Sequence, residues 1–396
     1  MQKKTIGGYF LRFDISHLYL WRSNGRVHNC SFLNYPFFYN FLGKLKMSLY
    51  YLWIMYKKFH YLLFLPIFFG IQSCEKESAV STQIAVSKGV LILNEGNFMG
   101  GNATVTYRDL ISGELSSDLF QGNNGFYLGD VGQSLLQLDG KIYLVVNNSG
   151  KIEVLNSSDF KSVMTIQGLN SPRYLLKVGT DKAYVTDLYA KKITILKLST
   201  GAKIGEIPLP YWSEELLLLN GKVYIGTVEN DKVYLVDPVS DAITDSIQTA
   251  FSPGSLAADK EGNLWVLCYG SETASQNGSV YKITAPGNSA SLLHNFQVPL
   301  PYGSMLTTNR LSDSLFVLAS DVYGFPISNP NFSSPIVERN GRNLTAIGYD
   351  SNSFRLYVAD SKDFNQKGEI FVHKPEGVAV DSFLAGVIPG MFLFVE

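Results

Sequence analysis

The 396-residue chain is 46% hydrophobic, 13% aromatic and 17% charged, which excludes a disordered or coiled-coil chain. Residues 1–73 hold nine basic side chains and one acidic one, so the remainder carries 33 − 9 = 24 basic against 34 − 1 = 33 acidic groups, a net charge of −9. Because a domain of that charge repels phosphate backbones, we expect no nucleic-acid partner.

A secretion signal is predicted at residues 55–73. Lys57 and Lys58 precede an apolar run from Tyr61 to Gly70. That run is shorter than the about 20 residues that a transmembrane helix needs, so a membrane-spanning anchor is the weaker interpretation. Residues 1–54, which lack strand or helix periodicity, are interpreted as an extension upstream of the true start.

The signal ends in Ile71-Gln72-Ser73-Cys74, which resembles the lipobox of bacterial lipoproteins. The resemblance implies that Cys74 is acylated and that residues 74–87 form a tether; an ordinary signal peptide with an incidental cysteine is the alternative. Glu75-Lys76-Glu77 resembles the export tag that sends lipoproteins of the Bacteroidetes to the cell surface. We therefore expect a protein held in the outer membrane by lipid alone and facing the exterior.

A unit of about forty residues recurs through residues 88–396. Its mark is a turn followed by an aromatic residue inside an apolar run, and successive aromatics are 41, 40, 41, 51 and 41 residues apart. They are Tyr143, Tyr184, Tyr224, Trp265, Phe316 and Tyr357, and Gly89–Leu93 adds a seventh copy without its aromatic. Four antiparallel strands per copy predict an all-β fold, a seven-bladed β-propeller.

The ends of the repeat predict how the ring closes. Only the tether precedes Gly89, so the first copy lacks an inner strand, and Ile388–Phe394 repeats the pattern that opens other copies. We expect this last strand to pair with the first blade and remove an exposed edge. The sixth copy contains Pro326, Pro330 and Pro335, so its outer strands are predicted to be short or displaced.

Loops from strand two to strand three, and from blade to blade, emerge on one face of a propeller around the channel mouth. Turns favour Asn, Asp and Gly for backbone reasons alone, but they have no such need of aromatic residues. Aromatics beside amides and carboxylates suit a ligand with flat apolar faces and a polar fringe. The candidate ligand-binding residues on this rim are Asn94, Glu95, Asn97, Phe98, Tyr127, Asn147, Asn148, Arg173, Asp187, Tyr189, Tyr269, Asp321, Tyr323 and Asp360.

Several segments resemble the YncE-like surface propellers of the Bacteroidetes. They are Leu93–Phe98, Leu128–Asp130, Asn147–Gly150, Ser171–Tyr174, Ala183–Asp187, Asp360 and the closing Gly386–Gly390. The resemblance implies a lipid-anchored seven-bladed propeller outside the outer membrane. Some members of that family capture cobalamin and pass it to a TonB-dependent transporter.

Three functions remain open from the sequence. The leading one is capture of a large nutrient, such as cobalamin, for a TonB-dependent transporter, which needs no catalytic group and no cofactor. A propeller hydrolase could hold Ca²⁺ with Glu95, Asn147, Asp187 and Asp360. However, residues 74–396 contain His294 and His373 as their only histidines and no hydrolase motif, so we expect no enzyme. The third is a protein or glycan scaffold.

Overall fold

The computed structural model describes residues 84–86, 88–284 and 287–395, which all belong to one unit spanning Ala79–Glu396. The predicted extension, signal segment, acylated Cys74 and most of the tether lie outside the described residues. No helix of the described part is both long and apolar enough to cross a bilayer.

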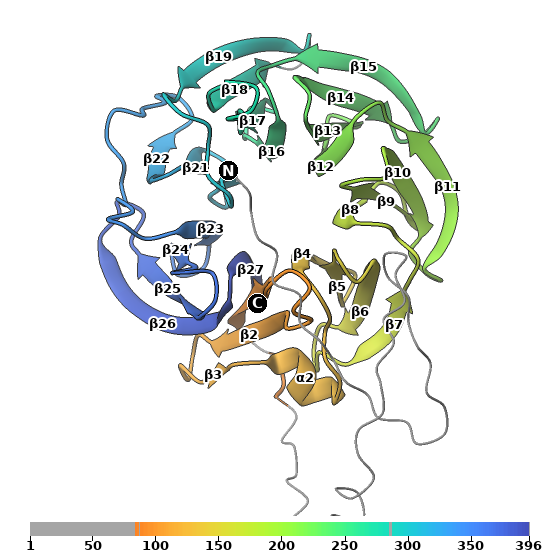
Figure 1. The fold of residues 1–396 in the computed structure, drawn as a ribbon, viewed down its shortest axis with the longest axis vertical. Helices are drawn as coiled ribbons and strands as arrows, with labels where there is room; N and C mark the ends of the chain where they lie inside the picture. Colours follow the sequence, from red (N-terminus) through yellow and green to blue (C-terminus); the bar gives the residue numbers. More distant parts are fainter. Residues whose placement is uncertain (1–83, 87, 285–286, 396) are drawn as a thin grey trace, which may run out of the picture. The chain divides into compact units, whose positions relative to one another are not determined.

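The described strands form seven antiparallel sheets arranged as the blades of a ring (Figure 1). Numbered along the chain and written from the inner to the outer strand, the first four blades are the following. Blade 1 contains β27 (Pro389–Val395), β1 (Gly89–Asn94), β2 (Thr104–Asp109) and β3 (Leu115–Ser116); blade 2 contains β4 (Gly132–Leu138), β5 (Lys141–Val146), β6 (Lys151–Asn156) and β7 (Ser162–Ile166); blade 3 contains β8 (Pro172–Lys177), β9 (Lys182–Asp187), β10 (Lys192–Lys197) and β11 (Ala202–Pro208); blade 4 contains β12 (Trp212–Leu219), β13 (Lys222–Val228), β14 (Lys232–Asp237) and β15 (Ala242–Gln248).

The remaining blades complete the ring, and one short helix, α2 (Leu119–Asn124), connects blade 1 to blade 2. Blade 5 contains β16 (Pro253–Ala258), β17 (Leu264–Cys268), β18 (Ser279–Thr284) and β19 (Ser289–Asn295); blade 6 contains β20 (Met305–Thr308), β21 (Ser314–Leu318) and β22 (Val322–Pro326); blade 7 contains β23 (Leu344–Asp350), β24 (Arg355–Asp360), β25 (Lys367–His373) and β26 (Ala379–Val387). The predicted all-β, seven-bladed β-propeller is confirmed.

The core lies between the blades. The second strand of each blade is an apolar run because both of its faces are covered by neighbouring blades, and β1 is buried along its whole length. The described apolar side chains form seven clusters, one at each junction between neighbouring blades. Tyr184 of blade 3, for example, packs in the same cluster as Val223 of blade 4. The recurring aromatic of the sequence therefore marks a contact between blades.

The last strand closes the ring as predicted. Strand β27 pairs antiparallel with β1, with Gly89 opposite Val395 and Ile92 opposite Phe392. Blade 6 also agrees with the prediction from its prolines, because it has three strands and its fourth position is represented by an isolated bridge from Val337 to Val322. The ring is thus closed by pairing between the last strand of the repeat region and the first.

Candidate functional site

A cavity of about 370 Å³ lies in the central channel, at the face where the loops between second and third strands emerge. Residues from all seven blades line it, which places it on the axis of the ring. They are Glu95, Gln133, Arg173, Tyr174, Leu188, Glu214, Glu215, Val228, Tyr269, Leu300–Met305, Thr345, Gly390 and Met391. A concave site that gathers a few polar groups among apolar ones is the usual form of a small-molecule site.

Bulges in the inner strands turn side chains into this cavity. The pairing of β8 with β9 shifts register between Pro172 and Leu175, and that of β12 with β13 shifts between Ser213 and Leu216. Similar shifts interrupt β4, β16, β23 and β27 near their first residues. The residues skipped by these shifts are Gln133, Arg173, Tyr174, Glu214, Glu215, Gly254, Thr345 and Gly390, and all but Gly254 line the cavity. Because a bulge redirects the side chain it leaves unpaired, the backbone itself builds the site.

Arg173 is the cation of the cavity. Its Nε donates to Glu214 Oε2 at 2.8 Å, and its Nη1 donates to Gln133 Oε1. The side chains of Arg173 and Glu214 are 18% and 6% exposed, so the ion pair is largely withdrawn from water. These contacts fix the guanidinium between blades 2, 3 and 4.

Glu95 and Tyr302 meet at the mouth of the cavity. The Tyr302 hydroxyl, in the loop from blade 5 to blade 6, donates to Glu95 Oε2 of blade 1. Desolvation raises the pKa of the Glu95 carboxyl to about 7, although the Tyr302 hydrogen bond and the charge of Arg173 both lower it. Gly390 allows this approach, because a Cβ there would lie 2.6 Å from Glu95 Oε1.

Glu215 is a second carboxyl with a raised pKa. Its Oε2 accepts hydrogen bonds from the Leu256 backbone N–H at 2.7 Å and the Ser255 hydroxyl at 3.1 Å. Desolvation nevertheless raises the pKa of Glu215 to about 7, and the neighbouring Glu214 charge adds to the effect. Near neutral pH the cavity therefore contains two carboxyls that each exchange a proton.

Tyr269 closes the cavity on the side of blade 5. Burial raises the pKa of its phenol, so the ring stays neutral. Its ring lies against Gly254, where an added Cβ would come within 2.1 Å of the ring carbon Cε2. The glycine is thus required for the position of this aromatic side chain.

The structure brings three of the predicted site residues to the cavity: Glu95, Arg173 and Tyr269. Four others are buried away from it, namely Asn94, Asn147, Asp187 and Asp360. The Asn94 amide donates to both Thr104 and Thr106 and accepts from the Gly386 N–H. Its hydrogen bonds are therefore made within the protein.

Asp187, Asp360 and Asn147 also bond to their own chain. Asp187 accepts from the backbone N–H groups of Ser171 at 2.8 Å and Tyr189 at 3.0 Å, and Asp360 accepts from those of Asn343 and Lys362. Asn147 donates to the Pro172 carbonyl at 2.9 Å. These side chains order the loops around the cavity and do not line it.

The remaining predicted residues lie on the rim or between blades. Phe98, Tyr127 and Tyr189 are exposed by 71%, 69% and 59%. Among the polar side chains, Asn97 donates to the Phe364 carbonyl, Asn148 donates to Asp130, and Asp321 accepts from the Arg339 N–H. Tyr323 packs against Phe332, with ring centroids 5.6 Å apart. The exposed aromatics are thus free to contact a ligand, whereas Tyr323 contributes to the core.

The sequence analysis did not select several cavity residues as ligand-binding, including Gln133, Tyr174, Glu214, Glu215 and Tyr302. One signal pointed to Tyr302. The spacing of 51 residues between Trp265 and Phe316 exceeds the others by about ten, and the extra residues lengthen the loops that carry Tyr269 and Tyr302. The inner-strand residues gave no such signal, because a bulge leaves no distinctive residue pattern in this sequence.

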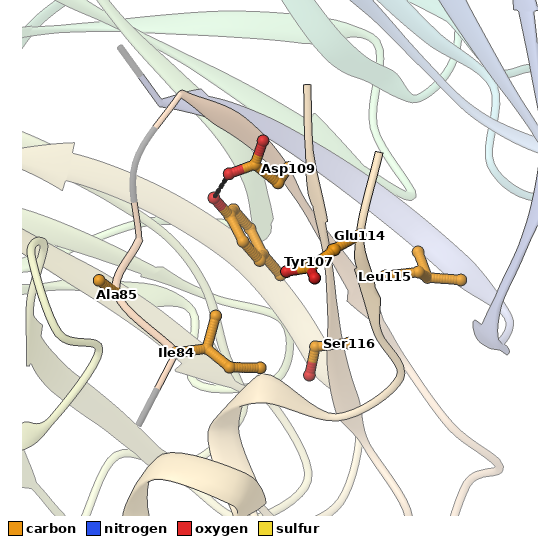
Figure 2. A pocket seen from close by; sticks show the side chains of 7 residues that line it. All are labelled: Ile84, Ala85, Tyr107, Asp109, Glu114, Leu115 and Ser116. Atoms are coloured by element: carbon orange, nitrogen blue, oxygen red, sulfur yellow. Dashed lines mark hydrogen bonds between the residues drawn. The ribbon is translucent and has the colours of Figure 1, made fainter. Parts of the chain in front are cut away.

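A second hollow, of about 510 Å³, lies beside the chain's entry into blade 1 (Figure 2). It is lined by Ile84, Ala85, Tyr107, Asp109 and Glu114–Ser116, and the Tyr107 hydroxyl donates to Asp109 at 3.4 Å. One wall is the entering chain itself, and the other is the edge of a single blade. We take the axial cavity as the candidate site because ionisable and aromatic groups from all seven blades converge there.

No group of three or more His, Cys, Asp or Glu side chains in the described residues is placed to hold a metal ion. Of the four oxygen ligands that the hydrolase alternative would use, Glu95 alone lines the cavity. The chemistry available in the cavity is hydrogen bonding, charge and aromatic contact.

Fold and cavity together define a seven-bladed β-propeller with a polar, aromatic-lined cup at one end of its channel. The chain belongs to the family described as a domain of unknown function, DUF5074, whose model matches residues 88–335. No curated protein matches the sequence significantly.

Solved structures share the fold. A Quinonprotein alcohol dehydrogenase-like protein from Bacteroides thetaiotaomicron has a TM-score of 0.64 at 17% identity, over 78% of this chain and 79% of that one. A protein from Lactobacillus plantarum has a TM-score of 0.58 at 12% identity, over 78% and 100% of the two chains. The dihydro-heme d1 dehydrogenase NirN has a TM-score of 0.55 at 8% identity, over 78% and 75%. At these identities the likeness establishes the fold alone.

Proposed function

We propose that this protein is a binding protein that captures a large nutrient at the mouth of its central channel. The observation that carries the proposal is the axial cavity itself, in which carboxyls, one guanidinium and phenols converge. Exposed aromatics stand on loops next to it: Tyr189 follows the cavity residue Leu188, and Phe98 lies three positions after Glu95. A polar group of the ligand enters the cavity while its larger body rests on the rim.

Our finer proposal is that the nutrient is a corrinoid such as cobalamin, as the resemblance to YncE-like surface propellers of the Bacteroidetes suggests. A corrinoid is larger than a cavity of about 370 Å³, so its ring system would stay outside. Its amide arms carry both donors and acceptors, which complement the carboxyls and Arg173.

Calorimetric titration of the purified protein with cyanocobalamin tests this ligand. We expect saturable heat, and we expect Tyr189→Ala to weaken binding by about tenfold because an exposed aromatic contact is lost. Val239→Ala is the control, since Val239 is 91% exposed in the loop between a third and a fourth strand, on the face opposite the cavity. Absence of both heat and thermal stabilisation at high ligand concentration would end the corrinoid proposal.

We further propose that Cys74 carries a lipid, that the protein sits on the outer surface of the outer membrane, and that it delivers its ligand to a TonB-dependent transporter. Cys74→Ala should move the protein from the membrane fraction to the soluble fraction. Retention of this variant in the membrane would contradict lipid anchoring. Co-purification of a TonB-dependent transporter with the wild-type protein from solubilised membranes tests the partnership.

A further inference from the structure

The cavity contains more hydrogen-bond acceptors than its own donors satisfy. Glu95, Glu214 and Glu215 each accept hydrogen bonds through Oε2. The described part of the chain provides no hydrogen bond to the Oε1 atom of any of the three. Glu214 is the clearest case, because its side chain is only 6% exposed and yet lines the cavity with this oxygen unbonded. None of these Oε1 atoms is among the fully buried, unpartnered side-chain atoms of the described residues, so they are open to the cavity and available to the donors of a ligand.

The cavity also has an excess of negative charge. Arg173 is the one cationic side chain in the lining, against three carboxyls, so the ionised cavity carries a net charge of −2. Arg173 already pairs with Glu214 at 2.8 Å. Neither Glu95 nor Glu215 forms an ion pair with any described residue. A cation placed between them would offset the cost of keeping two carboxylates in a desolvated channel.

The aromatic lining narrows the kind of cation. Tyr174, Tyr269 and Tyr302 all border the cavity, and the face of a phenol ring attracts an organic cation. The described residues hold no cluster of three ligands for a metal ion, whereas an organic ammonium needs only one or two carboxyls. A small organic ammonium combines N–H donors, positive charge and an apolar stem.

We propose that the cavity receives an organic ammonium group, whose N–H donors bond to the carboxyls without an ion-pair partner, Glu95 and Glu215, while the tyrosines contact its charge and stem. The inference rests on the proposed function in taking the channel mouth as the ligand site. It adds that the cavity binds a positively charged donor more tightly than a neutral donor. A nutrient that carries a primary amine is then a better ligand than one that carries carboxamides alone.

Calorimetry with three matched probes tests the selection: 1,4-diaminobutane, succinamide and 1,4-butanediol. We expect the diamine to bind at least about tenfold more tightly than either neutral compound. Glu95→Gln and Glu215→Gln should each lower the affinity for the diamine by about tenfold, because each removes a charge but keeps the shape of the side chain. Glu272→Gln, at an exposed loop position away from the cavity, is the control and should leave affinity unchanged.

The outcomes separate this inference from the proposed function. Any of three results would overturn the ammonium proposal. They are equal binding of succinamide and diamine, no binding of the diamine, and wild-type affinity in both Gln variants. If cyanocobalamin still bound in any of these cases, the proposed function would stand. Should a Gln variant fail to fold, the salt dependence of wild-type binding decides instead, because charge-driven affinity falls as ionic strength rises and neutral hydrogen bonding does not.

Discussion

Glu215 is an ionisable side chain buried in the channel. Two donors, from Leu256 and Ser255, hold one of its oxygens, and the surrounding inner strands exclude most water. The fold therefore tolerates a carboxyl whose pKa is about 7, well above the ordinary value of 4.5. A buried carboxyl with a raised pKa in a cavity is a candidate for contact with a ligand.

The raised pKa makes the stability of the protein depend on pH. Because the folded state binds the Glu215 proton more tightly than the unfolded state, the carboxyl's contribution is fully present below about pH 4.5 and is lost as pH rises to about 7. We expect Glu215→Gln to remove this loss, so that the variant gains about 3 kcal/mol over wild type between pH 4 and pH 8. Urea denaturation of both proteins across this range measures it. Parallel pH profiles would contradict the account.

Gly254 controls the position of Tyr269. A Cβ at Gly254 would lie 2.1 Å from the Tyr269 ring, so Gly254→Ala must displace the ring or the strand. We expect a loss of about 1–3 kcal/mol in the free energy of unfolding, together with weaker ligand binding. Gly122→Ala is the control, since it adds a methyl group to α2 with nothing within 4 Å. Equal melting temperatures for the two variants would show that the ring can move freely.

Residue types alone could not separate the positions that line the cavity from those that only order its loops. Asp187 ends a second strand and Glu95 directly follows one, yet Asp187 accepts hydrogen bonds from the loop backbone while Glu95 lines the cavity. An aspartate is short enough to cap its own loop, whereas a glutamate reaches further. Which of the two side chains reaches the cavity depends on the folded positions of the loops, and the sequence alone does not show these.

At the level of elements, strand β27 fastens the ring. It brings Val395 into the cluster between blades 1 and 2, and Phe392 into the cluster between blades 7 and 1. It also contributes Gly390 and Met391 to the cavity. One strand thus links closure of the fold to assembly of the site.

Deletion of the chain after Pro389 should abolish the single cooperative unfolding transition of the propeller. The deletion removes most of β27, leaves β1 with an unpaired edge, and uncovers two interblade clusters. Thermal unfolding followed by circular dichroism and calorimetry measures the effect, with Val239→Ala as a control that keeps the chain length. An unchanged melt would refute closure by β27.

The blades could be predicted from the sequence, but the bulges in their inner strands could not. The repeat revealed seven blades, because the aromatic inside each second strand packs between neighbouring blades and so recurs at a fixed spacing. The bulges that turn Arg173, Tyr174, Glu214 and Glu215 into the channel are register shifts between strands. Register depends on pairing in three dimensions, so the inner lining of the site could not be read from the repeat.

At the scale of the whole molecule, the cavity and the chain's entry lie on opposite faces of the ring. The entering residue Val86 bonds to the Ser158 carbonyl, in a loop between a third and a fourth strand, whereas the cavity opens among loops between second and third strands. Strand β1 runs from the first face to the second and ends one residue before Glu95. The candidate site therefore lies on the face of the ring opposite the entering residues 84–86.

Hydrogen-exchange mass spectrometry with and without cyanocobalamin tests the location of the ligand site most directly. The account predicts slower exchange on ligand addition in the loops after Glu95 and before Met305, and in the inner strands around Arg173 and Glu215, all of which border the axial cavity. Protection confined to residues 107–116 beside the lateral hollow, or no protection anywhere, would contradict it.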